Sequence, residues 1–227
     1  MLGPITLLRL SRLETDVDEI LAKLLPLYSF LLTELQGLGV AEVQLHEPAL
    51  VMSEASNLRE HFQEAYAQLA SAELPINLVT HFNDLGETYP WVVQLPVAAI
   101  SLDFTRGKNL ELMKTYGWSQ DKRLGAGVVD ARNIWRIRPQ QVFSLLEELQ
   151  GIAPNLAVQP SASLQFLPYD ATREQKLPEA LRDVLSFAEQ KLTEITFLAQ
   201  TLAGEDTKAV QEQLEEYWRA FYQFSPV

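Results

Sequence analysis

Short apolar runs alternate with longer amphipathic stretches along the chain, and this alternation limits the possible folds more than any other feature of the sequence. The apolar runs do not follow a strict alternation of apolar and polar residues, as expected of parallel strands that are covered on both faces. A strand followed by a helix, repeated about six times, is typical of parallel α/β architecture. The runs that we predict as strands are residues 1–8, 42–45, 76–81, 98–103, 124–129 and 156–159.

The amphipathic stretches between these runs are predicted helices. In the first, residues 15–37, Pro26 is expected to kink the helix or divide it. Its apolar side is predicted from side chains that recur at steps of three and four residues, namely Ile20, Leu24, Leu27, Leu31 and Leu35. The other predicted helices are residues 57–72, 88–95, 109–116, 139–149 and 177–202, and a final one that follows Asp206 and Thr207.

Two parallel α/β folds fit this order of elements: an open doubly wound sheet and a (β/α)8 barrel. The only glycine near the first run is Gly3, and no glycine-rich phosphate loop follows it, which weakens the doubly wound, dinucleotide-binding alternative. A full barrel has eight βα units in about 250 residues. We therefore predict an incomplete (β/α)8 TIM-type barrel of about six units, with the first two missing. It would cover residues 1–204, and residues 205–227 would form a C-terminal helical extension.

Charge and cysteine content exclude several classes of function. The 227 residues carry a net charge of -12, which argues against nucleic acid or an anionic membrane surface as a partner. No apolar run approaches the roughly 20 residues that cross a membrane. The chain has no cysteine, which excludes disulfides, a thiolate nucleophile and Cys-ligated zinc. We expect a cytoplasmic protein.

The segment from Val43 to Leu50, Val-Gln-Leu-His-Glu-Pro-Ala-Leu, places polar side chains at the end of a predicted strand, where barrel enzymes bind substrate. From spacing alone, His46 and Glu47 could equally form hydrogen bonds with neighbouring loops. The segment resembles the Gln-Ile-Asp-Glu-Pro-Ala-Leu signature of cobalamin-independent methionine synthases. Met1–Thr6 is similar to the Leu-Gly-Pro-Val-Thr strand of that family, and Leu25–Tyr28 to its Leu-Pro-Val-Tyr helix. Residues 127–135, Gly-Val-Val-Asp-Ala-Arg-Asn-Ile-Trp, resemble a motif specific to its N-terminal barrel.

The resemblance covers nearly the whole chain, to about Gly204, and implies the later part of an N-terminal barrel. Members of this family have two similar barrels in tandem and transfer a methyl group from polyglutamylated methyltetrahydrofolate to homocysteine. Zinc, held by the C-terminal barrel, lowers the pKa of the attacking thiol. The resemblance therefore implies no zinc in this chain. It also implies the C-terminal catalytic barrel as partner and folate polyglutamate as a possible ligand. A second copy in a dimer, which would cover the open edges of the sheet, is the alternative partner.

The internal similarity of the two barrels implies which positions correspond to the zinc ligands. His81 corresponds to the histidine ligand and Asp103 to the glutamate, whereas Asn83 and Ala162 replace the two cysteines. At least three protein ligands are needed for zinc, so we predict no metal site.

Other catalytic positions of the family are also changed. His46 replaces the aspartate that contacts the homocysteine amino group in the family. Arg132 lies near the position of its proton-donating histidine and cannot act as an acid at neutral pH. We predict no catalytic residue in this chain. Residues that would line the barrel mouth and contact substrate are His46, Glu47, His81, Asp103, Arg106, Lys108, Asp130, Arg132 and Asn133.

Three hypotheses of function follow. In the first, the chain is a segment of a methionine synthase that supports the folate cleft and is inactive alone. In the second, it is a stand-alone, non-enzymatic module that binds a small anionic ligand or a partner protein; Arg106 and Lys108 could bind a carboxylate, or could be solvated loop charges. In the third, it is an independent enzyme similar to uroporphyrinogen decarboxylases. Measurable turnover by the isolated chain would distinguish the third hypothesis from the first two.

Overall fold

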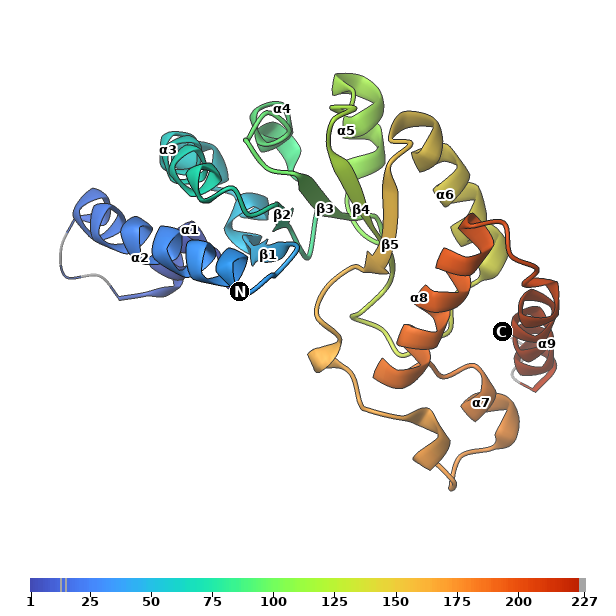
Figure 1. Cartoon of the computed structure of the whole chain (residues 1–227). Coiled ribbons are helices and arrows are strands. Elements are labelled where there is room, and N and C mark those ends of the chain that lie inside the picture. The colour runs from blue at the N-terminus through green and yellow to red at the C-terminus, as the bar shows by residue number, and fades with distance from the viewer. Residues whose placement is uncertain (13, 15, 225–227) are drawn as a thin grey trace. The chain divides into compact units, whose positions relative to one another are not determined.

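The structure is a computed structural model that describes residues 1–12, 14 and 16–224 (Figure 1). Strands and helices alternate along most of the chain. The strands are β1 (Val43–His46), β2 (Ile76–Val79), β3 (Ala99–Asp103), β4 (Arg123–Val129) and β5 (Leu156–Pro160). The α-helices are α1 (Pro4–Leu10), α2 (Val17–Gly37), α3 (Arg59–Leu69), α4 (Tyr89–Val92), α5 (Asn109–Tyr116), α6 (Pro139–Ile152), α7 (Glu179–Asp183), α8 (Ala188–Leu202) and α9 (Lys208–Phe224).

The chain divides into two compact units. Unit 1 consists of Met1–Gly125 with Ile152–Leu156, and unit 2 of Ala126–Gly151 with Ala157–Val227. The predicted division into residues 1–204 and 205–227 stays a prediction. Among the helices of the described residues, none is long and apolar enough to cross a membrane.

The five strands belong to one sheet, in the order β1-β2-β3-β4-β5. β1, β2 and β3 are parallel, with Val43 opposite Ile76 and Asn77 opposite Ala99. Every residue of β2 and β3 is buried, as expected for parallel strands with covered faces. The α/β class and five of the six predicted strands are confirmed, with shifts of one or two residues at their ends.

The remaining predicted strand, residues 1–8 at the start of the chain, is wrong. Only Leu2 pairs with β1, through a parallel bridge to His46, and the chain then turns into α1 at Pro4. Proline at the first helical position has a suitable φ and lacks only an N–H group that the helix does not use. Residues 5–8 therefore form a helix, because a short apolar run fits a buried helix as well as a strand.

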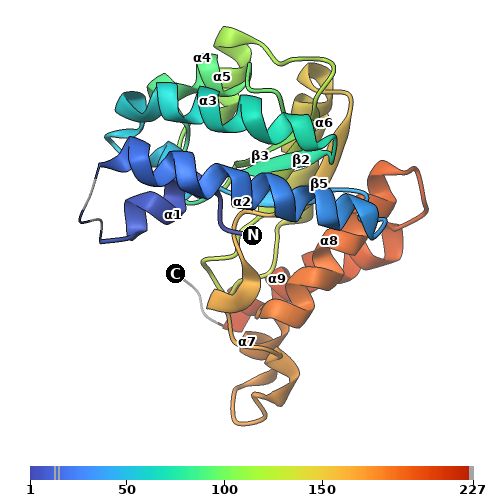
Figure 2. The ribbon, with the colours of Figure 1, turned by 60° about the vertical axis from the view of Figure 1, so that its left-hand side comes forward.

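The first long predicted helix is confirmed as α2, which Asp16 caps by accepting a hydrogen bond from Asp18 N at 2.9 Å. Pro26 lies inside α2 without dividing it. The predicted apolar side does not form the core face. α2 buries Leu21, Leu25, Tyr28 and Leu32 instead, a second series at helical spacing that begins one residue later. α2 packs beside α1 and α3 in unit 1 (Figure 2).

The remaining helices follow their predicted positions, with one division. α3 is flanked by 3-10 turns at Ala55–Leu58 and Ala70–Ala72, and the 3-10 turn Gly86–Thr88 precedes α4. The predicted helix at residues 177–202 is two helices, α7 and α8. They are separated because Leu185 forms an antiparallel bridge with Trp135 and Ser186 N donates to Ile134 O at 2.7 Å. Short 3-10 turns also occur at Pro48–Val51, Leu164–Phe166 and Ala171–Arg173.

Candidate functional site

Polar side chains of unit 1 gather where β1, β2 and β3 end. His46 is the last residue of β1 and Glu47 follows it; His81 lies two residues after β2, and Asp103 ends β3. Because the three strands are parallel, their carboxyl ends lie on the same edge of the sheet. The structure thus places four of the predicted site residues at one edge.

His46 and His81 are in direct contact. Nε2 of His81 lies 2.9 Å from Nδ1 of His46, so one ring donates and the other accepts. Burial, His81 and the terminal amino group lower the pKa of His46 to about 4. His46 is therefore neutral at physiological pH and cannot substitute for the carboxylate that the family has at this position.

Asp103 is buried and holds its own loop. Its Oδ1 accepts hydrogen bonds from Thr105 N at 2.8 Å and from Thr105 Oγ1 at 2.6 Å. Its main-chain oxygen accepts from Asn109 Nδ2 at 2.8 Å. These contacts fix the start of the β3–α5 loop, which makes Asp103 a loop-ordering residue in unit 1.

Glu47 is fully buried and holds the first residues of the chain (0% exposed). It accepts hydrogen bonds from Ile5 N at 3.1 Å, Thr6 N at 2.7 Å and Tyr66 Oη at 3.4 Å. Thr6 Oγ1 in turn accepts from Ala49 N at 3.1 Å. Burial raises the pKa of Glu47 to about 7, against the opposite effect of these hydrogen bonds. We name these contacts of Glu47 with Ile5 and Thr6 the Glu47 clamp.

The pKa of Glu47 predicts that unit 1 loses stability as the pH rises. Between about 4.5, the ordinary glutamate value, and about 7, the folded chain holds a proton that the unfolded chain has released. The free energy of unfolding should therefore fall by about 3 kcal/mol across this interval. Glu47→Gln, which cannot titrate, should lack this contribution. Urea unfolding of both proteins through this pH interval measures it; a difference that grows in favour of the wild type with rising pH would contradict the prediction.

The β3–α5 loop contains Arg106 and Lys108, both exposed. Lys108 N donates to Asp84 Oδ2 at 2.9 Å. Gly107, at φ +69°, approaches Asp84 so closely that a Cβ there would lie 2.4 Å from Oδ2. We predicted this turn as a carboxylate-binding segment. Its main chain already donates a hydrogen bond to a carboxylate of the chain itself, that of Asp84.

The other three predicted site residues follow β4 in unit 2. Asp130 accepts hydrogen bonds from Arg132 N at 2.7 Å and from Asn133 Nδ2 at 2.8 Å. Asn133 Oδ1 accepts from Trp135 N at 3.0 Å. These bonds form a tight polar turn at the end of β4, with the side chain of Arg132 exposed. The assignment of all nine residues to substrate binding stays a prediction.

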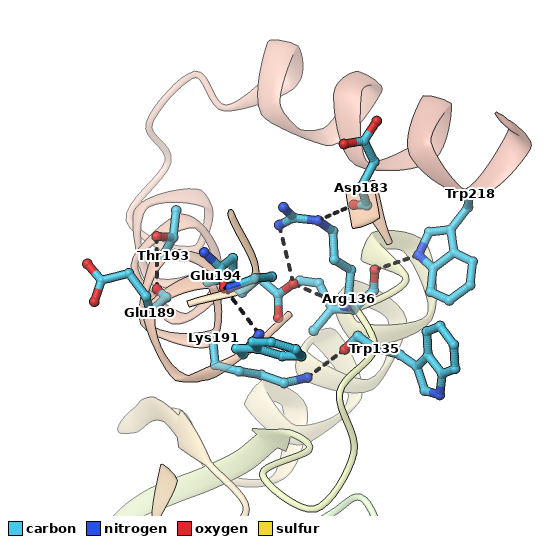
Figure 3. Close-up of polar contacts among 12 residues, drawn as sticks. Trp135, Arg136, Asp183, Glu189, Lys191, Thr193, Glu194 and Trp218 are labelled. Carbon is cyan, nitrogen blue, oxygen red and sulfur yellow. Dashed lines mark hydrogen bonds and ion pairs between the residues drawn. The ribbon is translucent and has the colours of Figure 1, made fainter. Parts of the chain in front are cut away.

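Two buried charged residues of α8, Lys191 and Glu194, hold the segment that follows this turn. We did not predict either of them from the sequence. Lys191 is 1% exposed and Glu194 is 2% exposed. Lys191 Nζ donates to Trp135 O at 2.6 Å, and Glu194 Oε1 accepts from Ile137 N at 3.3 Å (Figure 3). Both lie on the buried side of α8 with Leu198, and charged residues at apolar helical spacing are the signal that could have identified them.

Their ionisation reflects burial and pairing. Burial lowers the pKa of Lys191, while Glu194 and Asp130 act in the opposite direction. Burial raises the pKa of Glu194, and Lys191 counteracts this effect. Arg136 NH1 lies 3.9 Å from Glu194 Oε1 and its Nε donates to Asp183 O at 2.6 Å. The segment after β4 is therefore fixed by charges from α8 and by the end of α7.

The residues at the positions of the family's zinc ligands are a poor match to zinc. His81 is in contact with His46, Asp103 binds Thr105, and an Asn83 amide is a weak donor. In residues 1–12, 14 and 16–224, no group of three or more His, Cys, Asp or Glu side chains could hold a metal ion.

A parallel sheet with helices between its strands and polar residues at its strand ends defines an α/β domain of the kind found in barrel enzymes. Residues 1–154 match the family model described as cobalamin-independent synthase, N-terminal domain. The chain therefore belongs to the cobalamin-independent methionine synthases, as a segment of their N-terminal domain.

Named relatives agree with this assignment. Over its whole length the chain is 65% identical to the 5-methyltetrahydropteroyltriglutamate–homocysteine methyltransferase of Trichodesmium erythraeum and 61% identical to that of Synechococcus sp. strain JA-2-3B'a(2-13). Identity to the enzyme of Halalkalibacterium halodurans is 40% over 95% of the chain. The chain spans about 30% of the length of these relatives.

Proposed function

We propose that this chain is a supporting segment of a longer methyltransferase and is not catalytic alone. The complete enzyme would transfer the methyl group of 5-methyltetrahydrofolate polyglutamate to homocysteine, as the names of the relatives state for those proteins. The chain would contribute scaffold and one side of the folate cleft. The reacting groups, and zinc as the cofactor, would belong to the C-terminal barrel.

One observation carries this proposal: the polar groups at the strand ends form their hydrogen bonds with other residues of the same chain. His46 contacts His81, Asp103 holds Thr105, and Glu47 holds the main chain of Ile5 and Thr6. A general acid or base must reach a substrate proton, whereas Glu47 is fully buried. These groups order loops at the edge where a catalytic barrel would hold its substrate.

The proposal includes the complete architecture. The five strands and their helices would be part of a (β/α)8 barrel, whose remaining units would be supplied from outside this segment. The C-terminal catalytic barrel is the proposed partner, with a dimer of the chain as the alternative. The proposed location is the cytoplasm.

Methyl transfer tests the function directly. The isolated chain, given 5-methyltetrahydrofolate triglutamate, homocysteine and zinc, should form no methionine above a protein-free blank. A chimera of the Trichodesmium erythraeum relative, in which the matching segment is replaced by this chain, should form methionine. Turnover by the isolated chain, or stoichiometric zinc retained in it after dialysis, would refute the proposal.

The alternative function is a stand-alone module that binds a small anion near Arg106 and Lys108. The carboxylate of Asp84 at this turn weighs against it. Titration of the isolated chain with triglutamate, followed by calorimetry, distinguishes the two: the scaffold proposal expects no saturable heat, and the module expects a binding isotherm.

A further inference from the structure

The side of α2 that the sequence predicts as its core face is open to solvent. It consists of the five predicted apolar side chains, and Leu38 continues the row directly after the helix. We name the row the α2 stripe: Ile20, Leu24, Leu27, Leu31, Leu35 and Leu38. Leu27 is 65% exposed, Leu31 40% and Leu38 81%. The other three side chains are half-buried. α2 therefore has two apolar sides, and only one of them is covered by unit 1.

The shape of the stripe suits another helix. From Ile20 to Leu38 it extends about 27 Å along α2, at the helical rise of 1.5 Å per residue. Apolar residues at steps of three and four are the pattern by which two helices interlock along their length. A convex row of this kind offers no enclosed volume for a small ligand. An exposed apolar row of this length is unusual on a monomeric protein and marks an interaction surface.

The position of α2 indicates the source of that helix. α2 packs beside α3 on one side and beside α1 (Figure 2). α2 precedes β1, which is the first strand in the sheet order. Among the described residues, β1 pairs with β2 on one side and with Leu2 alone on the other. In parallel α/β architecture, the helix of the adjoining βα unit lies at such a place. The relatives are more than three times as long as this chain, so such a unit can come from the same polypeptide.

Charge favours a basic partner helix over a second copy of the chain. The solvent border of the stripe carries Glu19, Lys23 and Glu34. Lys23 Nζ lies 2.6 Å from Glu19 Oε1, so the border keeps the negative charge of Glu34. A second copy would bring the same acidic border and a net charge of -12, which opposes self-association. A partner helix with lysine or arginine beside its apolar row is complementary.

We propose that the α2 stripe is the packing surface for an amphipathic, basic-flanked helix supplied by a part of the synthase chain outside these 227 residues. This inference rests on the proposal that the chain functions within a longer synthase. It adds the surface through which that association is made, at the edge of unit 1 that begins with β1.

Single-cysteine labelling tests the surface. The chain has no cysteine, so Leu27→Cys introduces one thiol on the stripe and Thr33→Cys a matched thiol on the opposite, exposed side of α2. Each variant is made in the isolated chain and in the Trichodesmium chimera. Maleimide modification of the α2 peptide is followed by mass spectrometry. In the chimera, residue 27 should react more slowly by roughly tenfold or more, and residue 33 at the same rate as in the isolated chain.

Equal rates at residue 27 in both proteins would overturn the proposal. Slow labelling already in the isolated chain, restored by dilution, would also overturn it, because a second copy would then be the occupant. Leu31→Glu supplies an independent measurement: it should lower the melting temperature of the chimera and leave that of the isolated chain unchanged. An inactive chimera with a protected residue 27 would refute the proposed function alone, and an active chimera with an unprotected residue 27 would refute only the packing surface.

Discussion

Replacement of Lys191 by methionine should lower the free energy of unfolding by roughly 3–5 kcal/mol, the loss typical when one member of a buried set of interacting charges is removed. Methionine fills a similar volume but cannot donate to Trp135 O, which Lys191 Nζ contacts at 2.6 Å. It also removes one of the two cations, Lys191 and Arg136, whose charges stabilise the buried Glu194 carboxylate. Urea unfolding followed by tryptophan fluorescence measures the loss, because Trp135 and Trp218 lie in the affected unit.

The loss should depend on pH with a definite sign. Burial already raises the pKa of Glu194, and removal of Lys191 raises it further. A folded-state pKa above the unfolded value costs stability as the pH rises. Lys191→Met should therefore be more destabilised relative to wild type at about pH 8 than at about pH 5.

Lys208→Met is the matched control for Lys191. Lys208 forms an exposed pair with Glu212 at 3.8 Å in the same unit, and pairs of this type contribute at most about 1 kcal/mol. If both substitutions cost the same, the buried position of Lys191 has no special role in stability.

Gly3→Ala should destabilise unit 1, with a loss of about 3 kcal/mol in the free energy of unfolding. The main chain at Gly3 is extended, at φ −76° and ψ 156°, so alanine is not excluded by its dihedral angles. A Cβ would, however, lie 2.2 Å from both Cδ and Oε1 of Glu47. Glu47 cannot move away without releasing Ile5 N and Thr6 N. The midpoint of urea unfolding, compared with wild type, gives the size of the effect.

Gly37→Ala is the control for this substitution. Gly37 is the last residue of α2, and no atom lies within 4 Å of a Cβ added there. Alanine has the higher helix propensity and restricts the unfolded chain, so this variant should gain about 0.5–1 kcal/mol. A neutral Gly3→Ala would show that the Glu47 clamp can open without loss.

The strands could be predicted because their signal is local. The run at residues 124–129, Leu-Gly-Ala-Gly-Val-Val, has no polar side chain on either face and suits a covered parallel strand. Residues 1–8 failed because an apolar run of this length does not distinguish a strand from a buried helix, and Pro4 at the first helical position decided for the helix. The continuous helix at residues 177–202 failed because the bridge between Leu185 and Trp135 is a tertiary contact.

The face of α2 illustrates a different limit. Two series recur at the same steps of four, three and four residues: Leu21, Leu25, Tyr28 and Leu32, and Ile20, Leu24, Leu27 and Leu31. Periodicity alone therefore supplies two candidates for one core. Which of the two series is buried depends on α1 and α3, the neighbours that α2 meets only in the folded chain. The sequence therefore predicts that α2 is apolar, and the structure selects the side.

The candidate site was predictable in position and not in detail. Strand-end placement of His46, His81 and Asp103 follows from the βα order. Their engagement with neighbours does not, because contacts such as that of His81 with His46 span 35 residues. The buried contact of Lys191 with Trp135 spans 56 residues and was outside the reach of any motif.

The Glu47 clamp also sets an order of events during synthesis of the chain. Thr6 and Glu47 are separated by 41 residues, and ribosomes add about 5–20 residues per second. The segment around Ile5 and Leu8 is therefore translated roughly 2–8 s before the carboxylate that will hold it. During that delay its apolar side chains have no native partner from β1, and they are open to chaperones or to other nascent chains.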